Sequence, residues 1–330
     1  MYLPPGVTSA TLGAAFPIVS YYNTAIDFWR ANTPVLAECF DFKPMQRRSG
    51  RTMQLYGVKP FTGSTATIAE GVPPGSEQQA TAVADVFADE FGNWIGISNI
   101  VDMTFVNNGV TDATKNLSYQ SALVANLVGL TAVDAAATAD STARIDLGDN
   151  EFILSSTVAK VEAQLAGNNV PVRPGGEYVM LMHGFMAYDL FGDNTAGGIT
   201  DTAKRSESGA QMLENGISQN YTVCHWKGHK IVRTSTVSTF ANYPSSGKTG
   251  YGFYSFGFES FFASNITGVE VPKSPEFQVM VTPLTTPDLT NPLLQTRCIV
   301  GYDFFLGVTA RPNTNGTAGY RRGRAEISAI

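Results

Sequence analysis

Hydrophobic and polar residues alternate along two stretches in the first third of the chain. In residues 51–58 (RTMQLYGV) and 81–98 (TAVADVFADEFGNWIGIS) the alternation has the period of a half-buried β-strand. The stretch between them, FTGSTATIAEGVPPGSEQQ, is punctuated by glycine and proline. The pattern predicts a long β-hairpin with an elaborate tip.

A helical period follows the hairpin. Thr111 or Asp112 can cap a helix over residues 113–137, about twice the length of an average helix. The residues expected to face the core recur at helical spacing and are Tyr119, Leu123, Val124, Leu127, Val128 and Leu130. A second helix is expected over residues 156–167, capped by Ser155 or Ser156 and stopped at Gly167, with Val158, Val161 and Leu165 facing inward.

The second half of the chain mixes strands and helices without a regular βαβ rhythm. A buried strand is expected at residues 177–183, followed by helices at 184–193 and 204–214. The runs YTVCHW and HKIVRTSTV are separated by Lys227 and Gly228, as in a hairpin.

Further strands fit residues 276–281 and 297–309, whereas residues 1–45 are broken by proline and glycine. We read those first 45 residues as an extended arm with one short helix near residues 21–30. Together these elements predict the α+β class.

The low charge content changes this picture. Charged residues make up 15% of the sequence, against about 25% in an average soluble domain, while hydrophobic residues make up 43%. The chain can bury a large core, and much of its surface is expected to contact other proteins. The net charge of −6 argues against a protein that grips phosphate backbones.

Cysteine usage and apolar stretches indicate where the protein works. Cys39, Cys224 and Cys298 are odd in number and far apart, so we expect a reducing compartment and no disulfide framework. No signal peptide is recognisable, and the longest apolar stretch, 123–133, is interrupted by Asn126 and too short for a bilayer. We therefore expect no membrane partner.

Candidate metal chemistry is confined to the motif CHWKGH, which contains Cys224, His225 and His229. A zinc site needs about four ligands, and only Cys298 or a carboxylate could complete this one. We prefer a packed hairpin with an exposed histidine. His183 ends an apolar strand and is expected to be a hydrogen-bonded structural residue.

Catalytic motifs are not found in the sequence. It contains no nucleophile elbow, phosphate-binding glycine loop or dinucleotide fingerprint. Asp89 and Glu90 are adjacent in a predicted strand, point to opposite faces and cannot share a proton. We predict no catalytic, cofactor or metal site, and therefore no enzyme.

Charge is unevenly distributed along the chain. Residues 60–114 contain no lysine or arginine, and their acidic residues are Glu70, Glu77, Asp85, Asp89, Glu90, Asp102 and Asp112. Basic residues cluster before the hairpin and at the end of the chain, as Lys43, Arg47, Arg48, Arg51, Arg311, Arg321, Arg322 and Arg324. Two interpretations stay open: solvated faces that keep the protein soluble, or complementary contacts between subunits.

Several sequence pieces follow one another in a recognisable order. They are the basic strand entry at 51–56, the tip Ala69-Glu70-Gly71-Val72-Pro73, the return strand ending Ile95-Gly96-Ile97-Ser98, the long helix, VAKVEAQLAGNNVPV, EYVMLMHGFMAYDLFGD, MLENGIS followed by residues 228–235, GFESFF, and NPLLQTRCIVGYDFFLGV. In this order, over residues 46–312, the chain resembles the major capsid proteins of tailed bacteriophages, in particular the branch typified by N4-like podoviruses.

The resemblance implies the Hong Kong 97-type capsid fold. The implied parts are an N-terminal arm (1–45), a protruding hairpin called the E-loop (46–100), a peripheral domain (101–174 and 291–330) containing a spine helix (about 112–137), and an axial domain (175–290). A two-stranded hairpin is marginally stable alone, so it needs another surface to lie on.

Contacts between subunits are expected from both charged regions. The E-loop candidates are Thr62, Glu70, Gly71, Val72, Pro73, Glu77 and Asp85, and the basic candidates are Arg47, Arg48, Arg51, Arg321, Arg322 and Arg324. On this hypothesis the acidic hairpin of one subunit lies across the basic strand entry or the C-terminal arginines of another.

The implied function is structural. Hexamers and pentamers of the chain would form an icosahedral head around packaged double-stranded DNA, which they contact weakly and non-specifically. A portal protein at one vertex, and separate scaffolding and decoration proteins, are the further partners this family allows. The expected location is the virion, after assembly in the bacterial cytoplasm.

There are three alternative functions. A cellular nanocompartment protein of the same fold, similar to an encapsulin, would enclose cargo enzymes in place of a genome. A secreted adhesive or carbohydrate-binding β-rich module explains the threonine, glycine and aromatic content but not the long helix. A hydrolase needs a nucleophile and a base, and the sequence offers no such pair.

Overall fold

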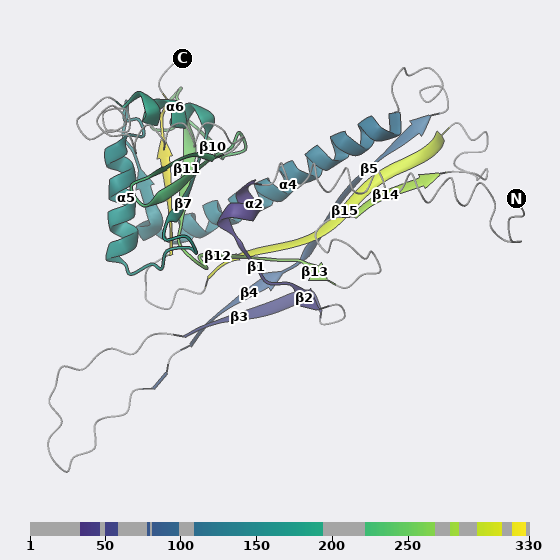
Figure 1. Cartoon of the computed structure of the whole chain (residues 1–330), viewed down its shortest axis with the longest axis horizontal. Helices are drawn as coiled ribbons and strands as arrows, with labels where there is room; N and C mark the ends of the chain where they lie inside the picture. Colours follow the sequence, from purple (N-terminus) through teal and green to yellow (C-terminus); the bar gives the residue numbers. More distant parts are fainter. Residues whose placement is uncertain are drawn as a thin grey trace, which may run out of the picture.

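The computed structural model describes residues 34–46, 50–58, 78–79, 81–98, 109–193, 222–267, 278–283, 296–311 and 319–327. A compact lobe lies at one end of a long helix, further strands run along that helix, and a hairpin projects away from both (Figure 1). The helices predicted at 21–30 and 204–214 lie outside the described residues. The mixture of helices with sheets of mixed direction confirms the α+β class.

The compact lobe is built on a seven-stranded sheet. Its order is β6 (Arg144–Asp146), β16 (Tyr320–Ala325), β11 (Thr249–Phe256), β7 (Tyr178–Met182), β9 (His229–Arg233) and β8 (Thr222–Trp226), with β10 (Thr239–Ala241) also paired to β11. All of β7 is buried because both faces of the sheet are covered. Met180 and Met182 face helices α5 (Ser155–Gly167) and α6 (Gly184–Gly192), whereas Val179 and Leu181 face the long helix.

The remaining strands, which we call the long lobe, are organised around the 15-residue strand β15 (Thr296–Ala310). β15 pairs antiparallel with β5 (Asp89–Ser98), β14 (Gln278–Pro283) and β12 (Phe261–Ser264), and β12 pairs with β1 (Asp41–Phe42). Alternate side chains of β15, from Cys298 to Leu306, share a buried cluster with helix α4 (Gly109–Ala139). One face of this sheet is thus covered by α4.

Helix α4 confirms the predicted long helix and extends it at both ends, and part of the predicted buried face is confirmed: Leu130 is buried, and Val124 and Val128 pack against the core. Two of the predicted residues turn outward instead. Tyr119 and Leu127 are 45% and 51% exposed. The residues that are buried are mostly small: Thr114, Leu117, Ser118, Ser121, Ala122, Ala125, Asn126, Gly129, Leu130, Val133 and Ala137. Small side chains let the helix approach its neighbours closely, and a Cβ at Gly129 would lie 3.3 Å from the Phe40 ring.

By length and hydropathy alone, α4 could cross a membrane, which the sequence pattern did not suggest. In the described structure α4 instead packs between sheets, and its buried hydroxyl groups bond back to the helix. Ser118 donates to the Thr114 carbonyl at 2.7 Å, and Ser121 donates to the Ser118 carbonyl at 2.8 Å. A short 3₁₀ turn, η1 (Ser141–Ala143), follows α4 and leads into β6.

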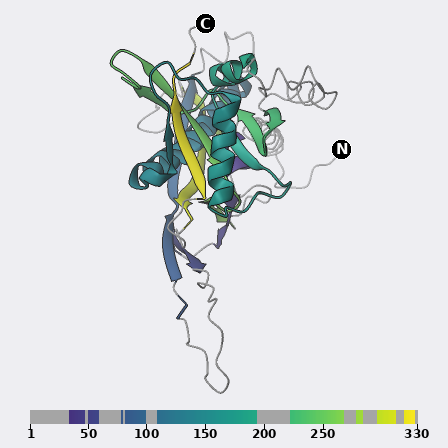
Figure 2. The same ribbon diagram turned by 90° about the vertical axis from the view of Figure 1, so that its left-hand side faces the viewer.

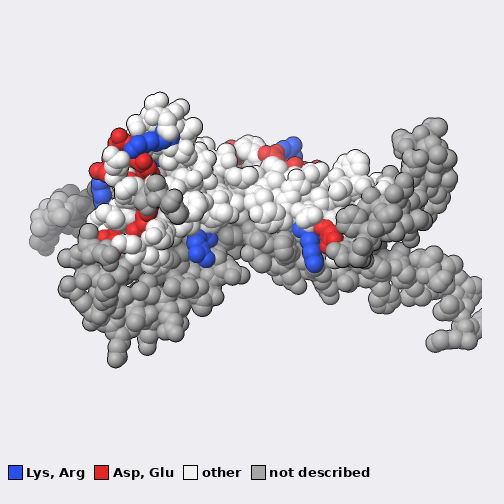
Figure 3. Space-filling model, turned by 90° about the horizontal axis from the view of Figure 1, so that it is seen from above, with Lys and Arg blue, Asp and Glu red and all other residues white. Residues whose placement is uncertain are grey.

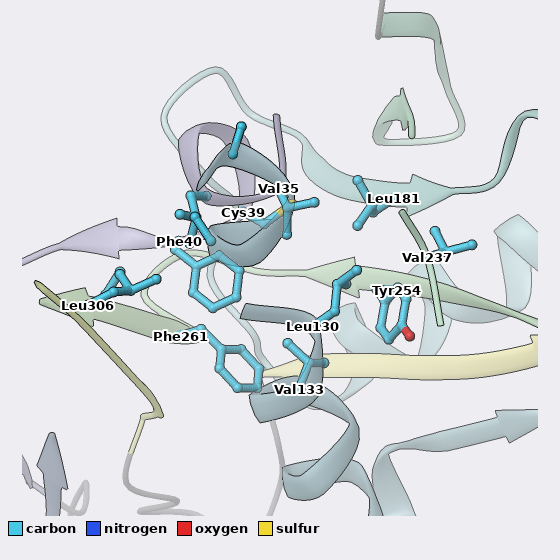
Figure 4. Packing of buried hydrophobic residues seen from close by; sticks show 14 of the residues in the cluster. Val35, Cys39, Phe40, Leu130, Val133, Leu181, Val237, Tyr254, Phe261 and Leu306 are labelled. Atoms are coloured by element: carbon cyan, nitrogen blue, oxygen red, sulfur yellow. The ribbon is translucent and has the colours of Figure 1, made fainter. Parts of the chain in front are cut away.

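Residues 34–46 form a strap that ties the lobes together. Helix α2 (Pro34–Cys39) and the following Phe40 enter the core beside α4, where Val35, Cys39 and Phe40 lie close to Leu130 and Phe261 (Figure 4). β1 then runs parallel to β12, and β2 (Met45–Gln46) runs parallel to β13 (Ile266–Thr267). Two ion pairs, Arg173–Asp41 at 3.0 Å and Lys230–Glu38 at 2.7 Å, hold the strap on the compact lobe.

The smaller predicted elements are confirmed, with corrections at the helix ends. Val158, Val161 and Leu165 of α5 are fully buried as expected, but Leu154 rather than a serine precedes the helix. Gly167 remains helical, and Asn169, with φ of 52°, takes the left-handed position after it. The β8–β9 turn has positive φ at Lys227 and Gly228, as a two-residue hairpin turn requires.

The two lobes are built from different residue ranges than the predicted peripheral and axial domains, and the division into those domains stays a prediction. β6, α5 and β16, which were assigned to the peripheral domain, pack in the compact lobe. β12 and β14, which were assigned to the axial domain, are strands of the long-lobe sheet. Periodicity indicates that an element is buried, but it does not indicate which sheet buries it.

Gly323 provides a test of the β16–β11 packing. A Cβ at this position would lie 2.0 Å from Cζ of Phe253, whose side chain is fully buried and cannot swing away. We expect Gly323→Ala to lower the free energy of unfolding by about 3 kcal/mol, measured by urea denaturation. Gly192→Ala, at a position with no atom within 4 Å, is the control and should change it by less than about 1 kcal/mol. Equal effects of the two substitutions would contradict the described packing.

Candidate assembly surfaces

The projecting hairpin has one face attached to its own subunit. β3 (Thr52–Val58) pairs antiparallel with β4 (Thr81–Phe87), which confirms the predicted hairpin. Leu55 and Val86 are buried against Met45 and Phe262, and Met53 packs on the same cluster. Phe262 lies opposite Thr309 in the β12–β15 ladder, on the face of the long lobe that α4 does not cover.

The opposite face of the hairpin is exposed and carries large apolar side chains among polar ones. Tyr56 and Val83 are directly opposite one another in the ladder and are 68% and 50% exposed, and Phe87 on the same face is 58% exposed. Asp85 is the acidic residue between them. Seen from the end of the molecule, β3 and β4 lie at the lower margin of the described body (Figure 2). Such a patch on a projecting ribbon is typical of a surface that is buried in an assembly.

The predicted return strand does not continue through residues 81–98. It breaks at Ala88, which is buried and whose N–H donates to the Arg51 carbonyl at 3.0 Å. β5 then leaves the hairpin and pairs with β15. The hairpin crosses β15 so closely that a Cβ at Gly307 would lie 2.3 Å from the Phe87 carbonyl oxygen, so the crossing requires glycine there.

A second exposed surface lies on the long lobe, on the side away from α4. Trp94, 67% exposed, stands over Gly301 with Gly92 nearby on the same face. Asp303 and Glu90 lie on this face too, and burial, followed by the Glu90 charge, raises the pKa of Asp303. We call this the Trp94 face. Sequence reasoning missed Tyr56, Val83, Phe87 and Trp94, although strand alternation together with their size could have identified them.

Only some of the acidic residues in this region belong to the part of the chain that the structure describes. Asp85 is exposed, whereas Asp89 forms an ion pair with Arg51 of its own chain. Thr62, Glu70, Gly71, Val72, Pro73 and Glu77, together with Arg47 and Arg48, lie outside the described residues. Where the described surface is seen from above, most of it is uncharged (Figure 3).

The three C-terminal arginines are engaged inside their own subunit, which corrects their predicted role. Arg321 and Arg322 on β16 are 3% and 4% exposed, and Arg322 Nε lies 3.0 Å from Asp134 on α4. Arg324 binds Asp146 and stacks on the Tyr243 ring at 4.2 Å. Replacing all three with glutamate would therefore disrupt the fold and could not test a contact between subunits. The run of arginines around Gly323 gives no sequence signal that both faces of β16 are covered.

The histidine motif is a structural hairpin. His225 is exposed and lies 2.5 Å from Glu177, whereas His229 is fully buried. His229 Nδ1–H donates to the Lys227 carbonyl at 3.0 Å, and Nε2 accepts from the Ser255 hydroxyl at 2.9 Å. No group of three metal-ligating side chains occurs among the described residues, and the Cys224 side chain is not among them. His183 caps α6 by accepting from the Phe185 N–H at 3.2 Å, as a structural histidine.

His229 should make the compact lobe acid-sensitive. Burial lowers its pKa from 6.5 to about 4, so the folded state binds this proton less readily than the unfolded state. Stability is therefore lost as the pH falls from about 6.5 to about 4, by about 3 kcal/mol in total. His229→Gln should flatten this part of the stability profile measured by urea denaturation, while His225→Gln, at an exposed site, should not. A profile that His229→Gln leaves unchanged would rule out this role.

Comparison with known proteins identifies solved structures that share this fold. The sequence matches no model of a known protein family and no curated protein. Solved structures match well: the capsid of Ralstonia phage GP4 has a TM-score of 0.65 at 12% identity, covering 88% of this chain and 87% of that chain. A chain of the cyanophage Pam1 capsid asymmetric unit has a TM-score of 0.65 at 12% identity, covering 88% and 89%. The head of Helicobacter pylori bacteriophage KHP40 has a TM-score of 0.59 at 8% identity, covering 87% and 88%. The chain therefore has the fold found in these phage capsids.

Proposed function

We propose that this chain is the major capsid protein of a tailed bacteriophage, a structural subunit without catalytic activity. Copies would assemble into hexamers and pentamers and close into an icosahedral head around double-stranded DNA. The observation that carries this proposal is a projecting hairpin with an exposed apolar face, on a fold shared with phage capsids.

The hairpin supports self-assembly on physical grounds. Its inner face is already used by its own subunit, while Tyr56, Val83 and Phe87 expose apolar surface on its outer face. A heterologous contact, in which this face meets a different surface on the next copy, generates rings when the rotation closes. The Trp94 face is a suitable receiving surface, because the exposed Trp94 lies beside Gly92 and Gly301 on a face that α4 does not cover. Interfaces of this obligate kind bury about 2,000 Å² or more.

The lobes fit the parts of the Hong Kong 97-type subunit in this proposal. The hairpin corresponds to the E-loop, α4 to the spine helix, the long lobe to the peripheral domain and the compact lobe to the axial domain. The tip residues Thr62, Glu70, Gly71, Val72, Pro73 and Glu77, with Asp85, remain proposed contacts with a neighbouring copy. Arg47, Arg48 and Arg51 remain their proposed basic partners.

The remaining partners follow from the same proposal. A portal protein would occupy one vertex, separate scaffolding and decoration proteins would act on the shell, and the packaged DNA would be touched weakly because the chain is acidic overall. The protein would assemble in the bacterial cytoplasm and end in the virion. The order of sequence pieces described above supports the N4-like branch.

Electron microscopy of the purified protein tests the proposal. Closed, uniform particles are expected as the concentration rises, and a protein that stays monomeric throughout would overturn it. The contents of particles isolated from the native source separate the two shell functions: nucleic acid supports a phage head, whereas enclosed enzymes would indicate a nanocompartment.

The outer face of the hairpin should control assembly but not folding. Replacing Tyr56 and Val83 with serine removes exposed apolar surface, so the unfolding midpoint should stay unchanged while the concentration needed for assembly rises by about 30-fold or more. Light scattering against concentration measures the second quantity. Leu55→Ser, on the inner face of the same strand, is the matched contrast and should lower the unfolding midpoint instead. Normal assembly of the double serine variant would show that the outer face is not a contact.

A further inference from the structure

A group of charges around the buried Arg322 lies where α4 passes from the long lobe to the compact lobe. Near the start of α4, Gln120 accepts from Asn93 of β5 at 3.0 Å. Further along, Asp134 reaches the compact-lobe sheet beside the buried Val133. The same helix is therefore bonded to the long lobe through Gln120 and to the compact lobe through Asp134.

Asp134 accepts hydrogen bonds from three side chains in separate segments of the compact lobe. Arg322 Nε on β16 lies 3.0 Å from its Oδ1, the Tyr254 hydroxyl on β11 lies 3.2 Å from both carboxylate oxygens, and the Ser238 hydroxyl bonds from the segment before β10. Burial raises the pKa of Tyr254 well above its usual range, so its phenol keeps the proton that it donates. The carboxylate therefore has a directional bond to each segment.

Further charged and aromatic side chains hold Arg322 in place. Arg322, with 5% of its side chain exposed, lies 3.6 Å from Asp146 on β6 and 4.6 Å from the Phe240 ring centroid. Arg324 also binds Asp146. Two arginines and two aspartates balance one another, so the group brings no net charge into the core.

Few large apolar side chains define the position of α4 along its axis. Most of its buried residues are small, among them Ser118, Ala122, Ala125, Gly129 and Ala137, and the larger ones are Leu117, Leu130 and Val133. A shift by one turn, about 5.4 Å, would press a side chain against the Phe40 ring in place of Gly129 and would break every bond to Asp134. A buried hydrogen-bonded charge is a known way to select one register among several apolar ones.

We propose that the Asp134–Arg322 pair fixes the position of α4 on the compact lobe, and thereby sets the angle between the lobes that lets subunits close into one shell size. The inference rests on the proposed shell function. Each contact between copies repeats the geometry of the subunit, so an angular error is repeated around the shell and prevents closure.

The test replaces the pair with apolar residues of similar size, Asp134→Leu with Arg322→Met. Such replacements commonly preserve stability, so the unfolding midpoint should remain within about 5 °C of the unsubstituted protein. The fraction of closed particles with the normal diameter, counted by electron microscopy, should fall by about tenfold or more, in favour of open or irregular products. The control, Glu259→Leu with Arg311→Met, removes an exposed pair near the end of β15 and should leave the particles uniform.

A milder variant keeps the test decisive if the apolar pair fails to fold. Ser238→Ala with Tyr254→Phe removes two of the three donors to Asp134 without leaving an unpaired buried charge, and should broaden the particle diameters in a folded protein. Uniform particles of normal diameter from either folded variant would overturn the inference. Failure of the unsubstituted protein to form particles would instead refute the proposed shell function.

Discussion

The close packing of one long helix against two sheets is the constraint on which the rest of this structure depends. α4 can serve both lobes because most residues of its buried face are small, with Phe40 of the strap filling the space over Gly129. Small side chains give close approach but little shape specificity. The buried bonds to Asp134 supply the missing specificity, and the strap adds ion pairs at Glu38 and Asp41.

The hairpin, too, is packed on its own subunit through only one of its faces. Its base is fixed on the long lobe by the crossing at Gly307 and by the cluster around Phe262, which leaves one face of a two-stranded ribbon in water. A ribbon of this size is marginally stable in isolation. In the proposed shell a neighbouring copy would cover the exposed Tyr56 and Phe87, and the Trp94 face is the receiving surface that we propose.

Much of the fold could be predicted from sequence, since strong periodicity identified α4, α5, β7 and the β8–β9 turn. The buried face of α4 was predicted only in part, because the hydrophobic pattern correctly selects Leu130 but also selects Tyr119 and Leu127, which turn outward. The burial of Arg321 and Arg322 was equally hidden, because their partners lie on distant elements. For the assembly surface, the location of the hairpin was predictable, whereas its exposed residues depended on knowing which face its own subunit covers.

The order of strands also has a consequence for how the chain is made. Ser264 donates to the Lys43 carbonyl across 221 positions, and β16, the last described strand, lies between β6 and β11 rather than at an edge. Neither sheet can be completed while the ribosome is still translating the middle of the chain, and topologies dominated by distant contacts fold slowly. β16 must therefore be synthesised before the compact-lobe sheet is complete, and in the proposed shell this would delay association between copies until then.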